Sequence, residues 1–193
     1  MKKKMLIAAL LAILTVLTAF GCGTKPVAPN NTVAPSETEN AADHYGKPFD
    51  EGFDMALVIG GKTYPIRIDS AEVIAALGED YEYSEAISCV YEGYDKTFTY
   101  DGLVLSTVPV DGEDVIEMYS VYSADYKTPR NITIGATREE VVAAYGEAFF
   151  DDGYYVTYTK SGDPSNIAEM RIQFFFENDV LKEFFIYSPS YSN

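Results

Sequence analysis

The chain has 193 residues, of which 47% are hydrophobic, and its 14 basic and 30 acidic side chains give a net charge of −16. This composition is typical of an acidic globular protein with one domain or two small ones. Nucleic acid is excluded as a partner, because phosphate binding requires clustered Lys and Arg, and such a cluster occurs only within the first four residues.

The start of the chain has the pattern of an export signal. Residues 2–4 are basic, and residues 5–20 form an apolar run shorter than the roughly 20 residues that span a membrane. Small Ala19 and Gly21 precede Cys22, which predicts cleavage after Gly21. This stretch resembles the lipobox of bacterial lipoproteins, which implies a signal peptide over residues 1–21 and lipidation of Cys22. Ordinary secretion with an incidental cysteine is the alternative, because Ala-x-Gly also suits the general signal peptidase.

Residues 22–44 are predicted to form a disordered tether that begins at the lipidated Cys22. They are rich in proline and small polar residues and contain no aromatic residue that could be buried. The single histidine, His44, lies at the end of this segment and is expected to be a solvated side chain. All 16 tyrosines and all but one of the 11 phenylalanines follow, so residues 45–193 are predicted to be the folded domain.

Two similar segments within this domain each predict a short helix. Residues 66–79 align without a gap on residues 134–147, after a hairpin predicted around Gly60-Gly61. Asp69 and Glu72 in the first segment, like Thr137 and Glu140 in the second, have the spacing of a capping box. An apolar stripe follows in each segment: Val73, Ile74 and Leu77 in the first helix, and Val141, Val142 and Tyr145 in the second. Gly78 and Gly146 are expected to end the two helices.

Strands are predicted after each helix. The first set is ISCVY, KTFTYDGLVLSTV with a turn at Asp101-Gly102, and DVIEMYSVY; the second is YYVTYT and EMRIQFFFENDVLKEFFIYS with a turn at Asn178-Asp179. FTYDGLVL also aligns with FFFENDVL. We therefore predict an α+β domain in which two tandem helix-plus-antiparallel-meander repeats, about 66–123 and 132–187, share one sheet and follow a β-hairpin.

This repeated unit of capped helix, glycine stop and antiparallel strands resembles the β-lactamase-inhibitor-protein-like fold, and more loosely the SmpA/OmlA (BamE-like) outer-membrane lipoproteins. The pattern IxIGxTxxEVxxxYG over residues 132–146 carries the resemblance. The inhibitor family holds its units together with disulfides, whereas Cys89 has no partner once Cys22 is lipidated. The resemblance therefore implies a fold and an envelope location, but no inhibition of a β-lactamase.

Catalytic and metal motifs are weak in this sequence. Cys89 lies in the predicted strand ISCVY without a nearby base and is expected to be a buried, inert thiol. Two cysteines and one histidine offer no zinc cluster, and the acidic turns 111–114 and 161–166 lack the ligand spacing of a calcium loop. The pairs Glu139-Glu140 and Asp151-Asp152 are read as solvated charge or turn residues. No cofactor is expected.

One strand suggests a binding surface. In MRIQFFFE, Met170, Ile172, Phe174 and Phe176 are expected to face the core, while Arg171, Gln173, Phe175 and Glu177 face outward. An aromatic residue between polar ones on an exposed face is common in protein interfaces. We therefore select Arg171, Gln173, Phe175 and, on the preceding strand, Tyr155 as partner-binding candidates. Alternatively, Phe175 packs under a loop or against the other repeat.

Together these features predict a lipoprotein anchored to the cell membrane through Cys22, on the extracytoplasmic side, that binds another envelope or secreted protein without catalysis. A sensor domain for a small ligand is the first alternative, which would require a closed apolar cavity between helices and sheet. An envelope hydrolase using a carboxylate pair is the second.

Overall fold

The computed structural model describes residues 40–147, 149–163 and 165–190. The predicted signal peptide, Cys22 and residues 22–39 of the predicted tether lie outside the described residues. None of the helices in the described ranges is long and apolar enough to cross a membrane.

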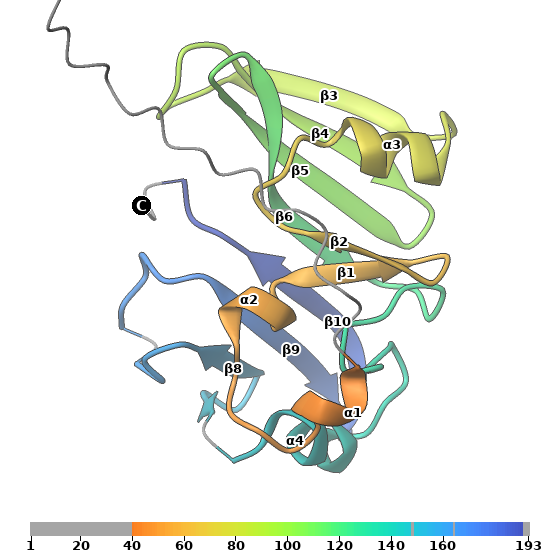
Figure 1. Ribbon diagram of the computed structural model, residues 1–193, viewed down its shortest axis with the longest axis vertical. Helices are drawn as coiled ribbons and strands as arrows, with labels where there is room; N and C mark the ends of the chain where they lie inside the picture. Colours follow the sequence, from red (N-terminus) through yellow and green to blue (C-terminus); the bar gives the residue numbers. More distant parts are fainter. Residues whose placement is uncertain (1–39, 148, 164, 191–193) are drawn as a thin grey trace, which may run out of the picture. The chain divides into compact units, whose positions relative to one another are not determined.

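Two short helices and a hairpin begin the described chain, and two further helices each precede a run of strands (Figure 1). The helices are α1 (Ala41–His44), α2 (Glu51–Asp54), α3 (Ala71–Leu77) and α4 (Arg138–Tyr145). The strands are β1 (Ala56–Ile59), β2 (Lys62–Pro65), β3 (Glu82–Ile87), β4 (Tyr94–Tyr100), β5 (Leu103–Val110), β6 (Glu113–Val121), β7 (Phe150–Asp151), β8 (Tyr155–Thr159), β9 (Arg171–Glu177) and β10 (Val180–Tyr187).

Eight strands form one antiparallel sheet in the order β3-β4-β5-β6-β10-β9-β8-β7, and β1 and β2 form a separate hairpin. The centre of the large sheet is the pairing of β6 with β10, in which Met118–Val121 lie opposite Phe184–Tyr187. The predicted α+β class, the antiparallel sheet and the preceding hairpin are confirmed.

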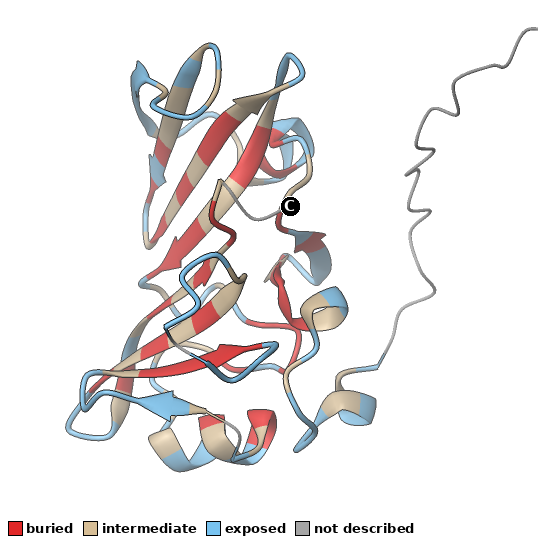
Figure 2. Ribbon diagram, turned by 90° about the vertical axis from the view of Figure 1, so that its left-hand side faces the viewer, coloured by how far each residue is buried: buried red, intermediate tan, exposed pale blue. Residues whose placement is uncertain are grey.

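The core lies on one face of this sheet. In β9 and in the second half of β10, residues alternate between buried and partly exposed positions, as the two-residue period of a strand requires (Figure 2). The buried row near the middle includes Phe174, Phe184 and Val121, all without exposed surface. Helices α3 and α4 and the β1–β2 hairpin pack on this face and contribute Val73, Val141, Tyr145 and Leu57 to the same apolar cluster.

The two longer helices differ in how they begin. At α4, the Thr137 side chain accepts the backbone N–H of Glu140 and the Glu140 carboxylate accepts the N–H of Thr137, so the predicted capping box is confirmed. At α3 the predicted box is wrong, because Ser70 is the N-cap and its side chain makes no capping hydrogen bond. The Asp69 carboxylate accepts the N–H of Ala71 instead, and Glu72 pairs with Lys62 at 3.1 Å.

Both helices end at the predicted glycines, and the predicted turns are also present. Gly78 and Gly146 have φ of 88° and 81°, a conformation that other residues rarely adopt. Gly102, at φ 72°, closes the turn between β4 and β5, and a Cβ added there would lie 2.2 Å from the Cβ of Ser123. Asn178-Asp179 forms the turn between β9 and β10.

The predicted strand ISCVY is mostly wrong. Only its first residue, Ile87, belongs to a strand, and Cys89 lies in the loop that follows β3. The Cys89 thiol is exposed rather than buried. Strand β3 itself, EYSEAI, was not predicted, because all six of its residues are exposed and it carries no alternating apolar signal.

A buried arginine fastens the N-terminal segment to the rest of the domain. The Arg130 guanidinium makes two 2.7 Å hydrogen bonds to the carboxylate of Asp54, and neither side chain has exposed surface. It also lies 4.6 Å from the centre of the Tyr145 ring. Its remaining hydrogen bonds go to the backbone carbonyls of His44, Lys47, Pro48 and Ala144. Every donor direction of the buried guanidinium is therefore used.

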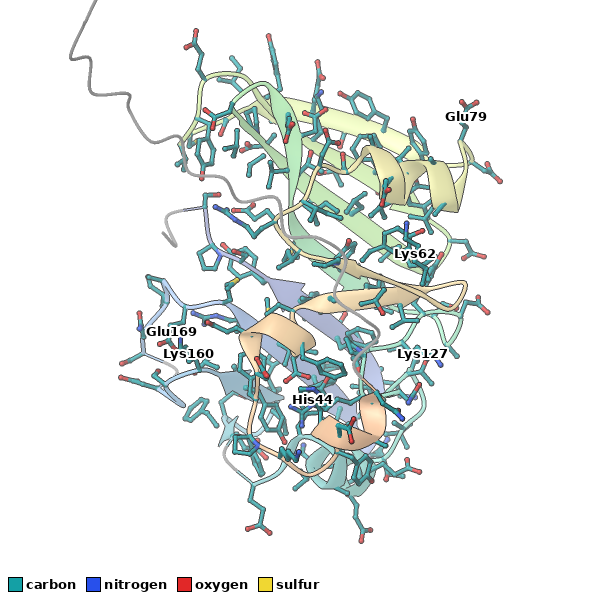
Figure 3. All side chains as sticks on the ribbon, in the orientation of Figure 1. His44, Lys62, Glu79, Lys127, Lys160 and Glu169 are labelled. Atoms are coloured by element: carbon teal, nitrogen blue, oxygen red, sulfur yellow. The ribbon has the colours of Figure 1, made fainter. Side chains whose placement is uncertain are left out.

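The prediction that His44 is a solvated side chain is wrong. The His44 ring stacks on Phe53 with ring centres 3.7 Å apart, and its side chain is only 16% exposed. In Figure 3 His44, the last residue of α1, lies between α1 and α2. The described fold therefore already includes α1, which precedes the expected start at Tyr45.

Candidate functional site

The four partner-binding candidates lie together on the face of the sheet opposite the core. Register places Tyr155 opposite Phe175 and the neighbouring pairs Thr157–Gln173 and Thr159–Arg171 along the same two strands. All four candidates are partly exposed. The alternation predicted for β9 is confirmed, since Ile172, Phe174 and Phe176 are buried.

Two of the four candidates use their polar groups within the domain. The Gln173 side chain donates to the Thr157 hydroxyl at 3.1 Å. Arg171 donates to the backbone carbonyls of Glu169 and Asn166, and so holds the loop before β9. The aromatic rings of Tyr155 and Phe175 are therefore the stronger candidates for an external contact.

Two further aromatic residues extend this pair. The ring centre of Phe185, on β10, lies 6.2 Å from that of Tyr155, and Tyr122, just after β6, lies 6.4 Å from Phe185. Tyr155 and Phe175 are 5.4 Å apart. We call these four residues, Tyr122, Tyr155, Phe175 and Phe185, the outer aromatic patch. It crosses the junction between β6 and β10.

Glu183 lies within this patch. On β10 it is opposite Phe175 and precedes Phe185 by two residues, so the three side chains share one face. Burial raises the pKa of Glu183 above its ordinary value of 4.5, and the nearby Glu177 carboxylate raises it further. Burial also raises the pKa of Tyr122 and of Tyr155, and the Glu183 carboxylate adds to both shifts. The Glu183 charge thus raises the pKa of a tyrosine on each side of β10.

Tyr122, Phe185 and Glu183 were not selected from the sequence. Phe185 could have been selected by the alternation in KEFFIYS, which places it opposite the buried Phe184 and Ile186. Tyr122 could not, because its position beside Phe185 depends on the pairing of β6 with β10, which are far apart in the chain. Glu183 lies opposite Phe175 in the predicted β9–β10 hairpin, but the register shift between Leu181 and Glu183 interrupts the simple alternation that would have indicated its face.

Three of the four carboxylates considered for catalysis have structural contacts, and the fourth, Glu139, is exposed. Glu140 closes the α4 capping box, and Asp151 forms an ion pair with Arg138 at 2.5 Å. Asp152 is exposed, and the backbone N–H groups of Tyr155 and Tyr154 lower its pKa. Among the described residues, no group of three or more His, Cys, Asp or Glu side chains is placed to hold a metal ion.

A hollow of about 620 Å³ lies beside the N-terminal helices. Its lining includes His44, Asp50, Glu51 and Lys160, and the last two form an ion pair at 3.5 Å (Figure 3). The hollow therefore lies at α1 and α2, and not between the longer helices and the sheet, where the sensor alternative requires a cavity.

Comparison with known proteins adds no functional information. No protein-family model matches the chain, and no curated protein matches it. Among solved structures, it is similar to the crystal structure of the uncharacterized protein yfeY from Escherichia coli. The two share 16% sequence identity over 67% of this chain and 95% of that chain, with a TM-score of 0.37. At this TM-score, neither the fold nor the function of this chain is inferred from the similarity.

Proposed function

We propose that this protein is a lipoprotein of the cell envelope, anchored through Cys22 on the extracytoplasmic side, that binds another envelope or secreted protein without catalysing a reaction. The observation that carries the binding proposal is the outer aromatic patch. Its four rings gather on a sheet face away from the helices, and aromatic residues are enriched where proteins bind one another.

We also infer that the domain is an internal duplication, with β3–β6 and β7–β10 as equivalent halves. In each half, a core tyrosine donates to the carbonyl of the glycine that ends the helix: Tyr100 to Gly78 at 3.3 Å and Tyr158 to Gly146 at 2.9 Å. Both tyrosines lie on the strand next to the sheet edge. This correspondence matches β4 with β8, so the alignment of FTYDGLVL with FFFENDVL, which matches β4 with β9, is not the one that the strand order favours.

The resemblance to the β-lactamase-inhibitor-protein-like and SmpA/OmlA units stays a proposal about architecture. It is supported by the helix that precedes four antiparallel strands in each half. The duplicated unit offers a simple origin for a broad sheet face, because joining two halves edge to edge doubles the surface available to a partner.

The anchor and the binding surface are tested separately. Cells expressing the full chain should incorporate labelled fatty acid into it, and Cys22→Ser should abolish the label. An unlabelled wild-type protein would refute the anchor and favour ordinary secretion.

For the surface, a photo-crosslinking phenylalanine analogue replaces Tyr155 in the full chain, and the control places it at Thr99. Thr99 is exposed on β4 on the same face of the sheet, outside the patch. A discrete adduct formed only from position 155 is expected. Equal adducts from both positions, or none from position 155, would refute the proposed binding surface.

A further inference from the structure

We propose that the outer aromatic patch binds a cationic side chain, an arginine or lysine of the partner protein, with the Glu183 carboxylate as its counter-charge. The inference deepens the proposed function, on which it rests, because it names the chemistry that the partner must present.

The position of Glu183 suits a cation. Phe175 lies directly across from it on β9, and Phe185 lies two residues along β10. The Glu183 charge also adds to the raised pKa of Tyr122 and of Tyr155. Aromatic rings attract cations to their faces, and a carboxylate between such rings adds a full opposite charge. The ring arrangement and the anion therefore favour the same ligand charge.

A counter-ion for Glu183 is not found within the part of the chain that the structure describes. No ion pair among the described residues includes it, although Lys62, Lys96, Arg130, Arg138 and Lys160 each pair with a carboxylate. The charged group that affects its pKa is Glu177, which is another acid. Lys182, the residue before Glu183 at the β10 bulge, is exposed, and no ion pair joins the two side chains. A partly buried carboxylate without a cation partner leaves its charge available to a cation from outside the chain.

The alternatives to a cationic protein side chain are less favourable. A purely apolar partner would bury the unpaired Glu183 charge and incur its desolvation cost. An anionic partner would be repelled, both by Glu183 and by the net charge of −16. A small free cation would find an open sheet face instead of an enclosing pocket, whereas a protein surface brings the apolar rim that excludes water around the pair.

The experiment is a titration of the full chain in detergent micelles, read from the backbone amide shifts of residues 155, 175, 183 and 185. The probes are the peptides acetyl-Gly-Leu-Arg-Leu-Gly-amide, its lysine version, and its citrulline version, in which the side chain keeps its shape but is neutral. We expect the two cationic peptides to bind the patch about fivefold to tenfold more tightly than the citrulline peptide.

Glu183→Gln should reduce this preference to less than about twofold, because it removes the charge and keeps the shape. The matched control is Glu113→Gln at the exposed start of β6, which should keep the wild-type preference. Phe175→Leu keeps an apolar side chain without a ring and should weaken binding of the arginine peptide.

Equal binding of the arginine and citrulline peptides, an unchanged preference in Glu183→Gln, or shifts confined to other residues would overturn the inference. The result is distinguishable from failure of the proposed function. An adduct from position 155 that persists without any arginine preference keeps the protein-binding surface and rejects the cation. An arginine preference without any adduct keeps the cation site and rejects the protein partner.

Discussion

Removing the Asp54 carboxylate tests how strongly the buried arginine stabilises the domain. In Asp54→Ala, Arg130 loses two charge-assisted hydrogen bonds and remains charged in a site without solvent exposure. Breaking a buried ion pair by removing one partner costs about 3–5 kcal/mol, which is a large part of the roughly 5–15 kcal/mol that stabilises a typical domain.

Arg130→Met should cost more than Asp54→Ala. It leaves the Asp54 carboxylate buried without a counter-ion, and it also removes the donor from the backbone carbonyls of His44, Lys47, Pro48 and Ala144. Each unsatisfied buried acceptor costs about 1–3 kcal/mol.

The assay is urea unfolding of the full chain, followed by far-ultraviolet circular dichroism, with the midpoint and slope fitted together. The control is Asp114→Ala, which breaks a partly exposed pair with Lys96 and should cost about 1 kcal/mol or less. The expected order of destabilisation is Arg130→Met, then Asp54→Ala, then Asp114→Ala. An Asp54→Ala chain within about 1 kcal/mol of the wild type would refute the reasoning.

Gly102→Ala should destabilise the domain by at least about 1–3 kcal/mol more than Gly112→Ala, since both positions have positive φ but only at Gly102 does the added Cβ clash; equal midpoints in urea would contradict this. Thr137→Ala should cost about 0.5–2 kcal/mol in the same assay, whereas Ser70→Ala, which removes no capping bond, should change little. Because the pKa of Glu183 is raised in the folded state, that state holds the proton more tightly than the unfolded one, and the contribution of Glu183 to stability falls as pH rises from 4.5 through its raised pKa. Glu183→Gln should therefore gain stability relative to the wild type between about pH 4 and 7, and a constant difference across that range would refute the assigned shift.

Local patterns in the sequence predicted much of the fold correctly. The α4 capping box, the two glycine stops and the turns at Asp101-Gly102 and Asn178-Asp179 each depend on a few adjacent residues. Interactions within so few residues form in the same way wherever the segment lies, so their patterns are readable without the tertiary structure.

The errors come from contacts between distant residues. At α3 the capping spacing of Asp69 and Glu72 is present, but Glu72 pairs with Lys62 from β2 instead. Strand β3 is defined only by its pairing with β4, because its own side chains are all exposed. The Arg130 cluster draws its acceptors from residues 44–54 and from Ala144, which no local pattern connects.

In the candidate site too, the residue that a local pattern indicates was found and those that depend on other contacts were missed. Phe175 was found because the strand period separates it from the buried Phe174 and Phe176. Tyr122 was missed because β10 pairs with β6, and Glu183 was missed because a bulge in β10 shifts the register of the β9–β10 hairpin.

The central position of β10 also determines the order in which the chain can fold. Val121 must find Phe184 across the intervening helix and strands, and such long-range pairing is slow because it closes a large loop. During synthesis, β6 and β9 are complete before β10 has left the ribosome, and both then have an unpaired edge that another chain could occupy. A product truncated before Val180 would leave the edges of β6 and β9 unpaired permanently. By pairing with both strands, β10 therefore protects the chain from aggregation.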